Sequence, residues 1–278
     1  MAQKRRGRAL LVCALAALAA LYLAPIAVVA WNSFKKKSFI TLDPFALPDA
    51  QSFSGWENYR TGIGKYGFFD AVGWTVFITV GSVAVILLCC SMCAWFVARA
   101  GGRLGRLFYL LCIFSMVVPF QMVMFTLSKT ADTLRLDTPW GIILVYLGFG
   151  AGLAVFLFYG FVQTIPAGIE EAAMIDGCSP LTTFFRVVLP IMRPTWISVG
   201  ILETMWIWND FLLPYLVLDQ KKYKTIAIVI QYMRGSYGRV DMGAIMACLV
   251  MAVIPVVVFY LTCQKYIIKG VAAGAVKG

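Results

Sequence analysis

The sequence predicts an all-α polytopic membrane protein with six transmembrane helices, both termini in the cytoplasm, and a cytoplasmic helix pair between the fourth and fifth helices. Hydrophobic residues make up 61% of the 278 residues and charged residues 13%, about half the ~25% that is usual in soluble domains. Six apolar stretches have about the length of 20 residues that crosses a bilayer. Because lipid-exposed strands leave backbone groups unpaired, we expect every stretch to be a helix.

The six predicted spans follow one another along the chain. They cover Ala9–Trp31, Ala71–Ala98, Leu107–Leu127, Trp140–Phe161, Thr195–Leu216 and Gly243–Cys263. The chain therefore divides into a cytoplasmic tail (1–8), a first transmembrane helix (9–31), an extracytoplasmic segment (32–70), a transmembrane core (71–264) and a cytoplasmic tail (265–278). Val28-Val29-Ala30 could pass as a signal-peptide cleavage site. The first apolar run is longer than the 7–15 residues of a signal core, which favours a retained helix.

Charge placement favours the inward orientation of both ends. Four cations precede the first span, and the short loop with Arg99, Arg103 and Arg106 carries no acid. Positive residues in short loops near helix ends mark the cytoplasmic side. The net charge of +11 is then explained by loops that face anionic lipid, with no need for nucleic acid.

Residue types exclude several kinds of chemistry. The chain contains no His, which excludes His-based catalytic triads and His metal sites. Cys90 and Cys93 form a C-x-x-C pair, but they lie in an apolar span where cysteines usually pack. We therefore expect no metal site and no disulfide framework.

The inner loop 164–194 predicts two short helices joined by a tight turn. Thr164 can cap the first helix, which opens near Pro166. Gly177 can adopt the positive φ that follows many helix ends. Ser179 and Pro180 then have the residue types of a cap and a first helical position.

The second helix of this loop predicts one apolar stripe and ends at Pro190. Its stripe consists of Leu181, Phe184, Phe185 and Val188, spaced as on one helix face. An amphipathic pair lying on lipid would show such a stripe, but its polar side should be basic. The first helix is acidic instead, which suits a groove on another protein.

One sequence pattern in this loop carries a family resemblance. Glu171-Ala172-Ala173, Gly177 and Val187-Val188-Leu189-Pro190 follow the spacing EAA-x3-G-x9-I-x-L-P, with Val187 in place of Ile. The segment resembles the EAA loop of ABC importer permeases. Similarity extends to Trp56–Tyr59, Pro119–Gln121 and Trp206–Phe211, and the tail Lys265–Gly278 resembles the MalG-type permease of maltose and multiple-sugar importers.

The resemblance implies a transmembrane permease subunit of an ABC importer for a di- or oligosaccharide, in a bacterial-type inner cell membrane. Its implied partners are a second permease in a heterodimer, two cytoplasmic ABC ATPase subunits and an extracytoplasmic sugar-binding protein. The EAA loop would couple to the ATPase through Glu170, Glu171, Ala172, Ala173, Asp176, Gly177, Leu189 and Pro190. A permease for a phosphorylated polyol such as glycerol-3-phosphate, or an ion-coupled secondary transporter, are the alternatives.

The chain is not expected to be an enzyme. No G-x4-G-K-[ST] pattern occurs, and Gly64-Lys65 is followed by Tyr66, so the sequence offers no cradle for nucleotide phosphates. We expect no cofactor in this chain, and ATP and Mg would be used by the partner subunits.

Polar residues within the spans are candidates for the substrate pathway. Glu203 and Asp210 are the acids within predicted spans, and they lie on one side of the fifth helix. Structural bonding is the alternative role for both. The complete candidate set is Glu203, Trp206, Asn209, Asp210, Gln121 and Tyr146. Outside, the apolar run Thr225–Met233 predicts a re-entrant helix or a helix on the membrane surface.

Overall fold

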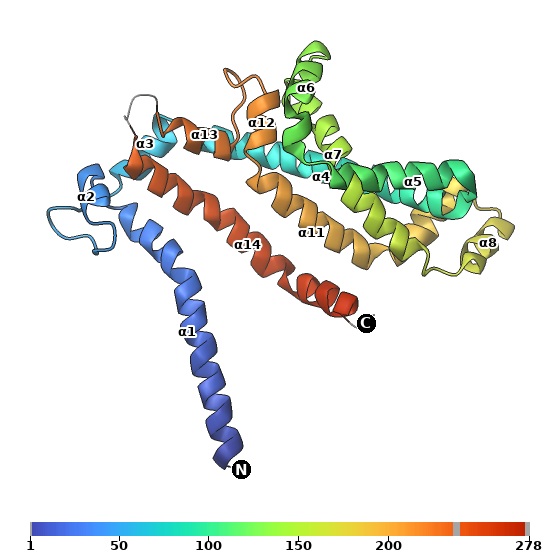
Figure 1. Ribbon diagram of the computed structural model, residues 1–278, viewed down its shortest axis with the longest axis horizontal. Helices are drawn as coiled ribbons and strands as arrows, with labels where there is room; N and C mark the ends of the chain where they lie inside the picture. The colour runs from blue at the N-terminus through green and yellow to red at the C-terminus, as the bar shows by residue number, and fades with distance from the viewer. Residues whose placement is uncertain (1, 236–239, 276–278) are drawn as a thin grey trace. The chain divides into compact units, whose positions relative to one another are not determined.

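The computed structural model describes residues 2–235 and 240–275, and these residues are mostly helical (Figure 1). No β-strand occurs in these two ranges beyond an isolated bridge between Lys35 and Phe53. Four helices are long and apolar enough to cross a membrane, or six if each of two sharply bent helix pairs counts as one span. The prediction of an all-α, multi-span chain is confirmed.

The chain forms two compact units, one of residues 1–69 with 229–257 and one of residues 70–228 with 258–278. The first unit contains α1 (Ala2–Asn32), α2 (Lys37–Leu42) and α3 (Glu57–Gly64), and α14 (Met242–Ala275) begins in it. Asn58 ties the connection after α1 to α3, because its amide donates to the carbonyls of Ser33 and Lys35 at 2.8 Å each. Within the chain the apolar part of α1 buries none of its residues, so lipid or a partner must cover it.

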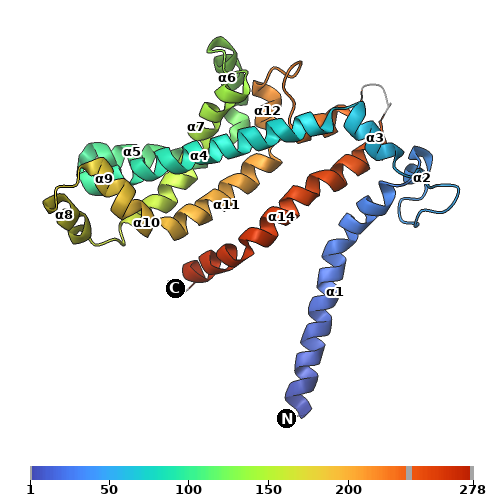
Figure 2. The same cartoon turned by 180° about the vertical axis from the view of Figure 1, so that it is seen from behind.

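The second unit is built around α7 (Pro139–Val162), which presents one buried face along its whole length. It also contains α4 (Phe68–Ala100), α5 (Gly102–Val117), α6 (Phe120–Thr133), α8 (Ala167–Ile175), α11 (Arg193–Asn209) and α12 (Leu212–Val217). The short helix α13 (Ile226–Tyr232) begins in this unit, where the amide of Ile226 donates to the Thr75 hydroxyl of α4 at 2.9 Å. Figures 1 and 2 show α4, α5, α7 and α11 running alongside one another, with α8 at one common end.

Glycines on α7 allow its neighbours to approach closely. A Cβ on Gly152 would meet Ser115 Oγ at 2.7 Å and the carbonyl of Cys112 at 2.8 Å, both on α5. The rings of Tyr109 and Tyr159 stack between the same two helices at 4.1 Å. Lipid is as apolar as a core side chain, so close packing of this kind is what holds helices together in a membrane.

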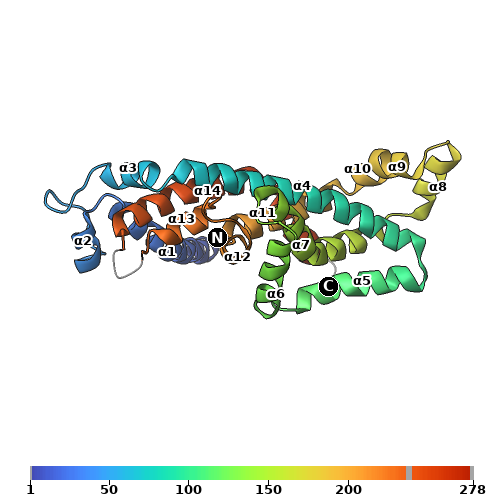
Figure 3. The ribbon, with the colours of Figure 1, turned by 90° about the horizontal axis from the view of Figure 1, so that it is seen from above.

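The third predicted span is not one helix. α5 and α6 meet at an angle of 105°, a change of direction that Figure 3 shows. Pro119 has no amide hydrogen to donate, and Val118 before it is extended with ψ 114°, the conformation that a following proline favours. The expectation of a continuous helix over Leu107–Leu127 is therefore wrong.

The fifth predicted span is also divided. α11 ends at Asn209, because Asp210 is extended with ψ 128°. A further bend of 78°, between Pro180–Ile191 and α11, lies just before the predicted span. The expected helix Thr195–Leu216 is thus α11 followed by the separate helix α12.

The helices at the two ends of the chain continue beyond the predicted spans. α1 begins at Ala2 and so includes most of the tail 1–8. α14 continues to Ala275 through most of the tail 265–278, whose last three residues lie outside the described ranges.

Candidate functional site: an exposed helical elbow and a polar helix interface

The loop 164–194 forms an elbow at the end of the second unit. α8 ends in a turn in which Gly177 has φ +88°, and the amide of Cys178 donates to the carbonyl of Ala173 at 3.0 Å. Ser179 then caps α9 (Pro180–Thr183), since its hydroxyl accepts from the Thr182 amide at 3.2 Å. The predicted roles of Gly177, Ser179 and Pro180 agree with this geometry.

Two expectations for the ends of these helices are wrong. The Thr164 hydroxyl donates backward to the carbonyl of Phe161 at 2.7 Å, and the N-cap position of α8 is Pro166, which offers no side-chain acceptor. Pro190 does not end the second helix, which continues through a π-helical segment (Phe184–Val188) into α10 (Leu189–Ile191). The wider π turn accommodates the absent amide hydrogen and the ring of Pro190.

The expected apolar stripe divides into two faces because the π turn changes the helical phase. Phe184 and Val188 are completely buried, whereas Leu181 and Phe185 remain 59% and 46% exposed. The two exposed side chains therefore add apolar surface on the outer side of the elbow.

The expected coupling residues are distributed over this elbow. Glu171, Ala172, Asp176, Gly177 and Pro190 are exposed, while Ala173 and Leu189 are half-buried. The exposed side also carries Met174 and Ile175, and the Ile175 side chain is 86% exposed. These two residues were missed by sequence reasoning, although their apolar side chains beside exposed acids were a usable signal.

Glu170 differs from the other expected coupling residues because its carboxylate points into the chain. It is 3% exposed and pairs with the Arg99 guanidinium of α4 at 2.7 Å. The indole of Trp95, also on α4, donates to its other oxygen at 2.8 Å. Glu170 therefore holds α8 to α4, and its expected part in coupling to an ATPase stays a prediction. Sequence reasoning missed Trp95 and Arg99 in this role, although their i, i+4 spacing already placed both on one helix face.

Three of the expected pathway residues meet between α7 and the end of α11. The Tyr146 hydroxyl donates to Asp210 Oδ2 at 3.0 Å, and the ring of Tyr146 packs edge-on against Trp206 at 5.5 Å. Asp210 Oδ1 accepts from the amide of Leu212 at 3.0 Å and so caps α12. The space next to this group, lined also by Thr75 and Thr79 and several apolar side chains, is too narrow for a water molecule.

Glu203 lies one turn further along the same interface. It is 1% exposed, and neither carboxylate oxygen has a hydrogen-bond partner in the described chain. A Cβ on Gly150 of α7 would lie 3.1 Å from Glu203 Oε2. Glu203 and Asp210 thus both face α7, as their spacing predicted.

The remaining two candidates stand apart from this group. Asn209 is exposed and donates to the carbonyl of Met205 on its own helix at 2.7 Å. Gln121 is exposed in the first turn of α6 and makes no hydrogen bond with the other candidates in the described chain.

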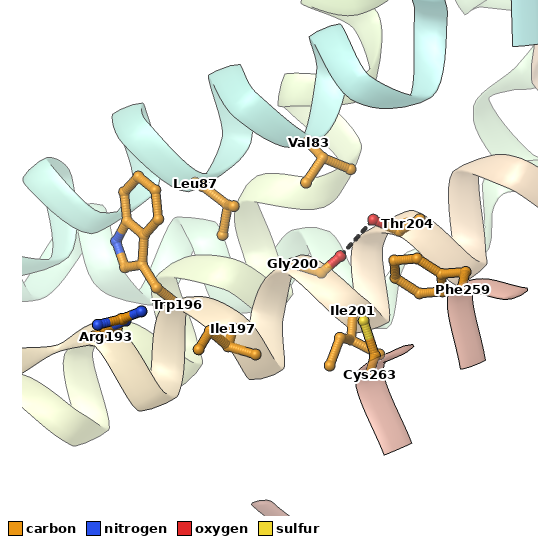
Figure 4. Close-up of a pocket in the computed structure, with 10 residues that line it drawn as sticks. All are labelled: Val83, Leu87, Arg193, Trp196, Ile197, Gly200, Ile201, Thr204, Phe259 and Cys263. Atoms are coloured by element: carbon orange, nitrogen blue, oxygen red, sulfur yellow. Dashed lines mark hydrogen bonds between the residues drawn. The ribbon is translucent and has the colours of Figure 1, made fainter. Parts of the chain in front are cut away.

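An apolar cavity of the second unit has a volume of about 410 Å³ and contains none of the candidate residues. Figure 4 shows Val83 and Leu87 of α4 on one side and Arg193, Trp196 and Thr204 on α11. The Thr204 hydroxyl already donates to the carbonyl of Gly200 at 2.6 Å. A cavity with so few free polar groups suits a hydrocarbon chain better than a sugar.

A second cavity, of about 470 Å³, is more polar and lies between α6 and α12. Ser128, Lys129, Asp132, Asp137 and Asp219 supply its polar lining. Among the described residues no group of three or more His, Cys, Asp or Glu side chains could hold a metal ion.

Comparison with known proteins connects this arrangement to a family. Residues 90–273 match the binding-protein-dependent transport system inner membrane component family. The chain belongs to this family. It is therefore a multi-pass membrane protein and a component of a binding-protein-dependent transport system.

Individual relatives match along nearly the whole chain. A probable starch degradation products transport system permease, AmyC of Thermoanaerobacterium thermosulfurigenes, is 35% identical over 94% of this chain and 93% of its own length. The multiple sugar-binding transport system permease MsmG of Streptococcus mutans is 32% identical over 92% of each chain. A solved bacterial ABC transporter chain involved in alginate import has the same fold, with a TM-score of 0.76 and 22% identity over 95% of this chain and 97% of its own.

Proposed function

We propose that this chain is one of two permease subunits of an ABC importer for a di- or oligosaccharide. Two cytoplasmic ATPase subunits would hydrolyse ATP with Mg, and an extracytoplasmic binding protein would deliver the sugar. The names of relatives that match over nine-tenths of their length describe transport of starch products and of multiple sugars, and they support this substrate class.

The observation that carries the coupling role is the exposed elbow of α8. Its outer side combines the acids Glu171 and Asp176 with the exposed apolar side chains of Met174 and Ile175. An apolar side chain that is 86% exposed at the tip of a short helix is costly in water and is stabilised when it enters a groove on another protein. Ala172, Ala173 and Gly177 have small side chains, which permit close approach of that partner.

The proposed substrate pathway includes the exposed residues Trp206, Asn209 and Gln121. An indole face and two amides suit the rings and hydroxyl groups of a sugar. Tyr146 and Asp210 support Trp206 from the buried side of α11, since Tyr146 contacts both residues. The buried position of Glu203 favours a packing role for it in this conformation.

Uptake by the whole complex, reconstituted in proteoliposomes with the subunits encoded beside it, tests this proposal. Maltotriose, raffinose, arabinotriose, diacetylchitobiose and glycerol-3-phosphate serve as labelled probes. We expect ATP-dependent uptake of at least one sugar and loss of that uptake in Glu171→Lys, with the protein still inserted. Uptake of glycerol-3-phosphate alone would overturn the substrate class. Uptake that continues without ATPase subunits, driven by an ion gradient, would overturn the whole proposal.

A further inference from the structure

One side-chain cluster of the second unit joins three helices at the base of the elbow. Arg99 donates to Glu170 Oε1 through Nε at 3.0 Å and through Nη2 at 2.7 Å. The indole of Trp95 donates to Glu170 Oε2 at 2.8 Å. Both carboxylate oxygens are thus engaged from α4. We call Trp95, Arg99 and Glu170 the anchor cluster.

The same guanidinium also reaches the exit of α7. Its Nη2 donates to the carbonyls of Ile165 at 2.8 Å and Val162 at 3.2 Å. These carbonyls belong to the last residue of α7 and to the linker that leads into α8. The guanidinium of Arg99, a residue of α4, therefore bonds to α7, the linker and α8 together.

The anchor cluster lies where α8 meets the end of α4, so it can transmit movement between the two helices. α8 otherwise packs against α9 and the π-helical segment, which belong to the same elbow. The anchor cluster is the direct polar connection from α8 to α4. Glu170 is buried and both of its carboxylate oxygens accept hydrogen bonds, while the neighbouring Glu171 is exposed. The two adjacent acids therefore face different ways.

We infer that Arg99 is a positioning residue for transport, and that the anchor cluster makes α8 and the adjoining ends of α4 and α7 move as one body. The inference rests on the proposed function, because it supplies the route by which movement of the elbow reaches the membrane helices. Removal of the cluster should leave α8 able to bind an ATPase subunit while the ends of α4 and α7 no longer follow it.

Charge pairing provides the discriminating variants. Arg99→Gln leaves a buried carboxylate without its cation, and Glu170→Gln leaves a cation without its anion. The double variant Arg99→Gln/Glu170→Gln removes both charges and retains groups that can hydrogen-bond to each other and to the α7 carbonyls. We therefore expect each single variant to be more impaired than the double variant.

Hydrogen exchange on the purified complex, with and without ATP and vanadate, measures the coupling. In the wild type we expect nucleotide to change the exchange of amides in α8 and also in the last turns of α4 and α7. In each single variant the response of α8 should persist while the response of α4 and α7 is lost, and the double variant should recover much of it. A role in stability alone would not separate the two responses.

Arg103→Gln is the matched control, because Arg103 is exposed on the neighbouring helix and should keep the wild-type pattern. Trp95→Phe removes one hydrogen bond and keeps the ion pair, so it still tests the inference if a charge variant fails to assemble. We expect this variant to weaken the response of α4 and α7. Wild-type responses in both single variants and in Trp95→Phe would overturn the inference, and so would a double variant no better than the singles. Absence of any α8 response in the wild type would instead overturn the proposed function on which it rests.

Discussion

At the scale of single residues, close packing in the second unit depends on a glycine beside a buried acid. Gly150 faces both Ile86 of α4 and Glu203 of α11. Glu203 is only 1% exposed, so the three helices pack closely around its carboxyl group. Polar groups in such dry positions are costly, which makes the site sensitive to small changes of volume.

Gly150→Ala should therefore destabilise the protein. The added Cβ would meet Ile86 Cδ1 at 2.7 Å and Glu203 Oε2 at 3.1 Å, and overpacking of this kind costs about 1–3 kcal/mol. Thermal unfolding of the purified protein in detergent checks the effect. Gly148→Ala is the control on the same helix, because nothing lies within 4 Å of its Cβ position. Equal unfolding temperatures for the two variants would contradict the packing described for Gly150.

At the scale of elements, local chemistry and tertiary contacts determine different parts of the elbow. The turn at Gly177 and the cap at Ser179 involve residues near in sequence, and both could be predicted from residue types. The direction of the Glu170 side chain could not be predicted in this way, nor could the burial of Phe184 next to an exposed Phe185. Both depend on which side of the helix meets α4 and the core, and the π turn that shifts the helical phase has no clear sequence signal beyond Pro190.

Ser179→Ala tests the cap as a property of the second helix of the elbow. The variant loses the acceptor for the Thr182 amide, and loss of an N-cap costs ~1 kcal/mol. We expect faster hydrogen exchange at the amides of residues 182–184. Ser198→Ala is the control, since the hydroxyl of this half-buried residue donates to the carbonyl of Pro194 within its own helix. Unchanged exchange in Ser179→Ala would show that tertiary contacts alone hold this helix.

At the scale of the whole molecule, an even number of spans places both termini on one side of the membrane. Six spans, with each of the two bent pairs counted as one, would meet this condition. We predict that this side is the cytoplasm, because the Arg99–Arg106 connection is basic and free of acids. The elbow of α8 would lie on the same side, where ATP is available.

Cysteine accessibility in intact cells tests this orientation. With the eight native cysteines replaced by alanine, a membrane-impermeant maleimide should label Lys129→Cys and Asp219→Cys. It should not label Arg103→Cys or Ile175→Cys until the cells are opened. The reverse pattern would place the elbow outside the cell and would overturn the coupling role.

The sequence by itself determined the helical class, the approximate positions of the spans and the place of the elbow, because these depend on composition, apolar run length and residue spacing. It did not predict the sharp breaks at Pro119 and Asp210. Only the tertiary structure decided which polar groups find partners: Glu170 with Arg99, Asp210 with Tyr146, and Glu203 with none in the described chain. These pairings join residues 64 to 71 positions apart, so they follow from how the helices pack and not from any local pattern.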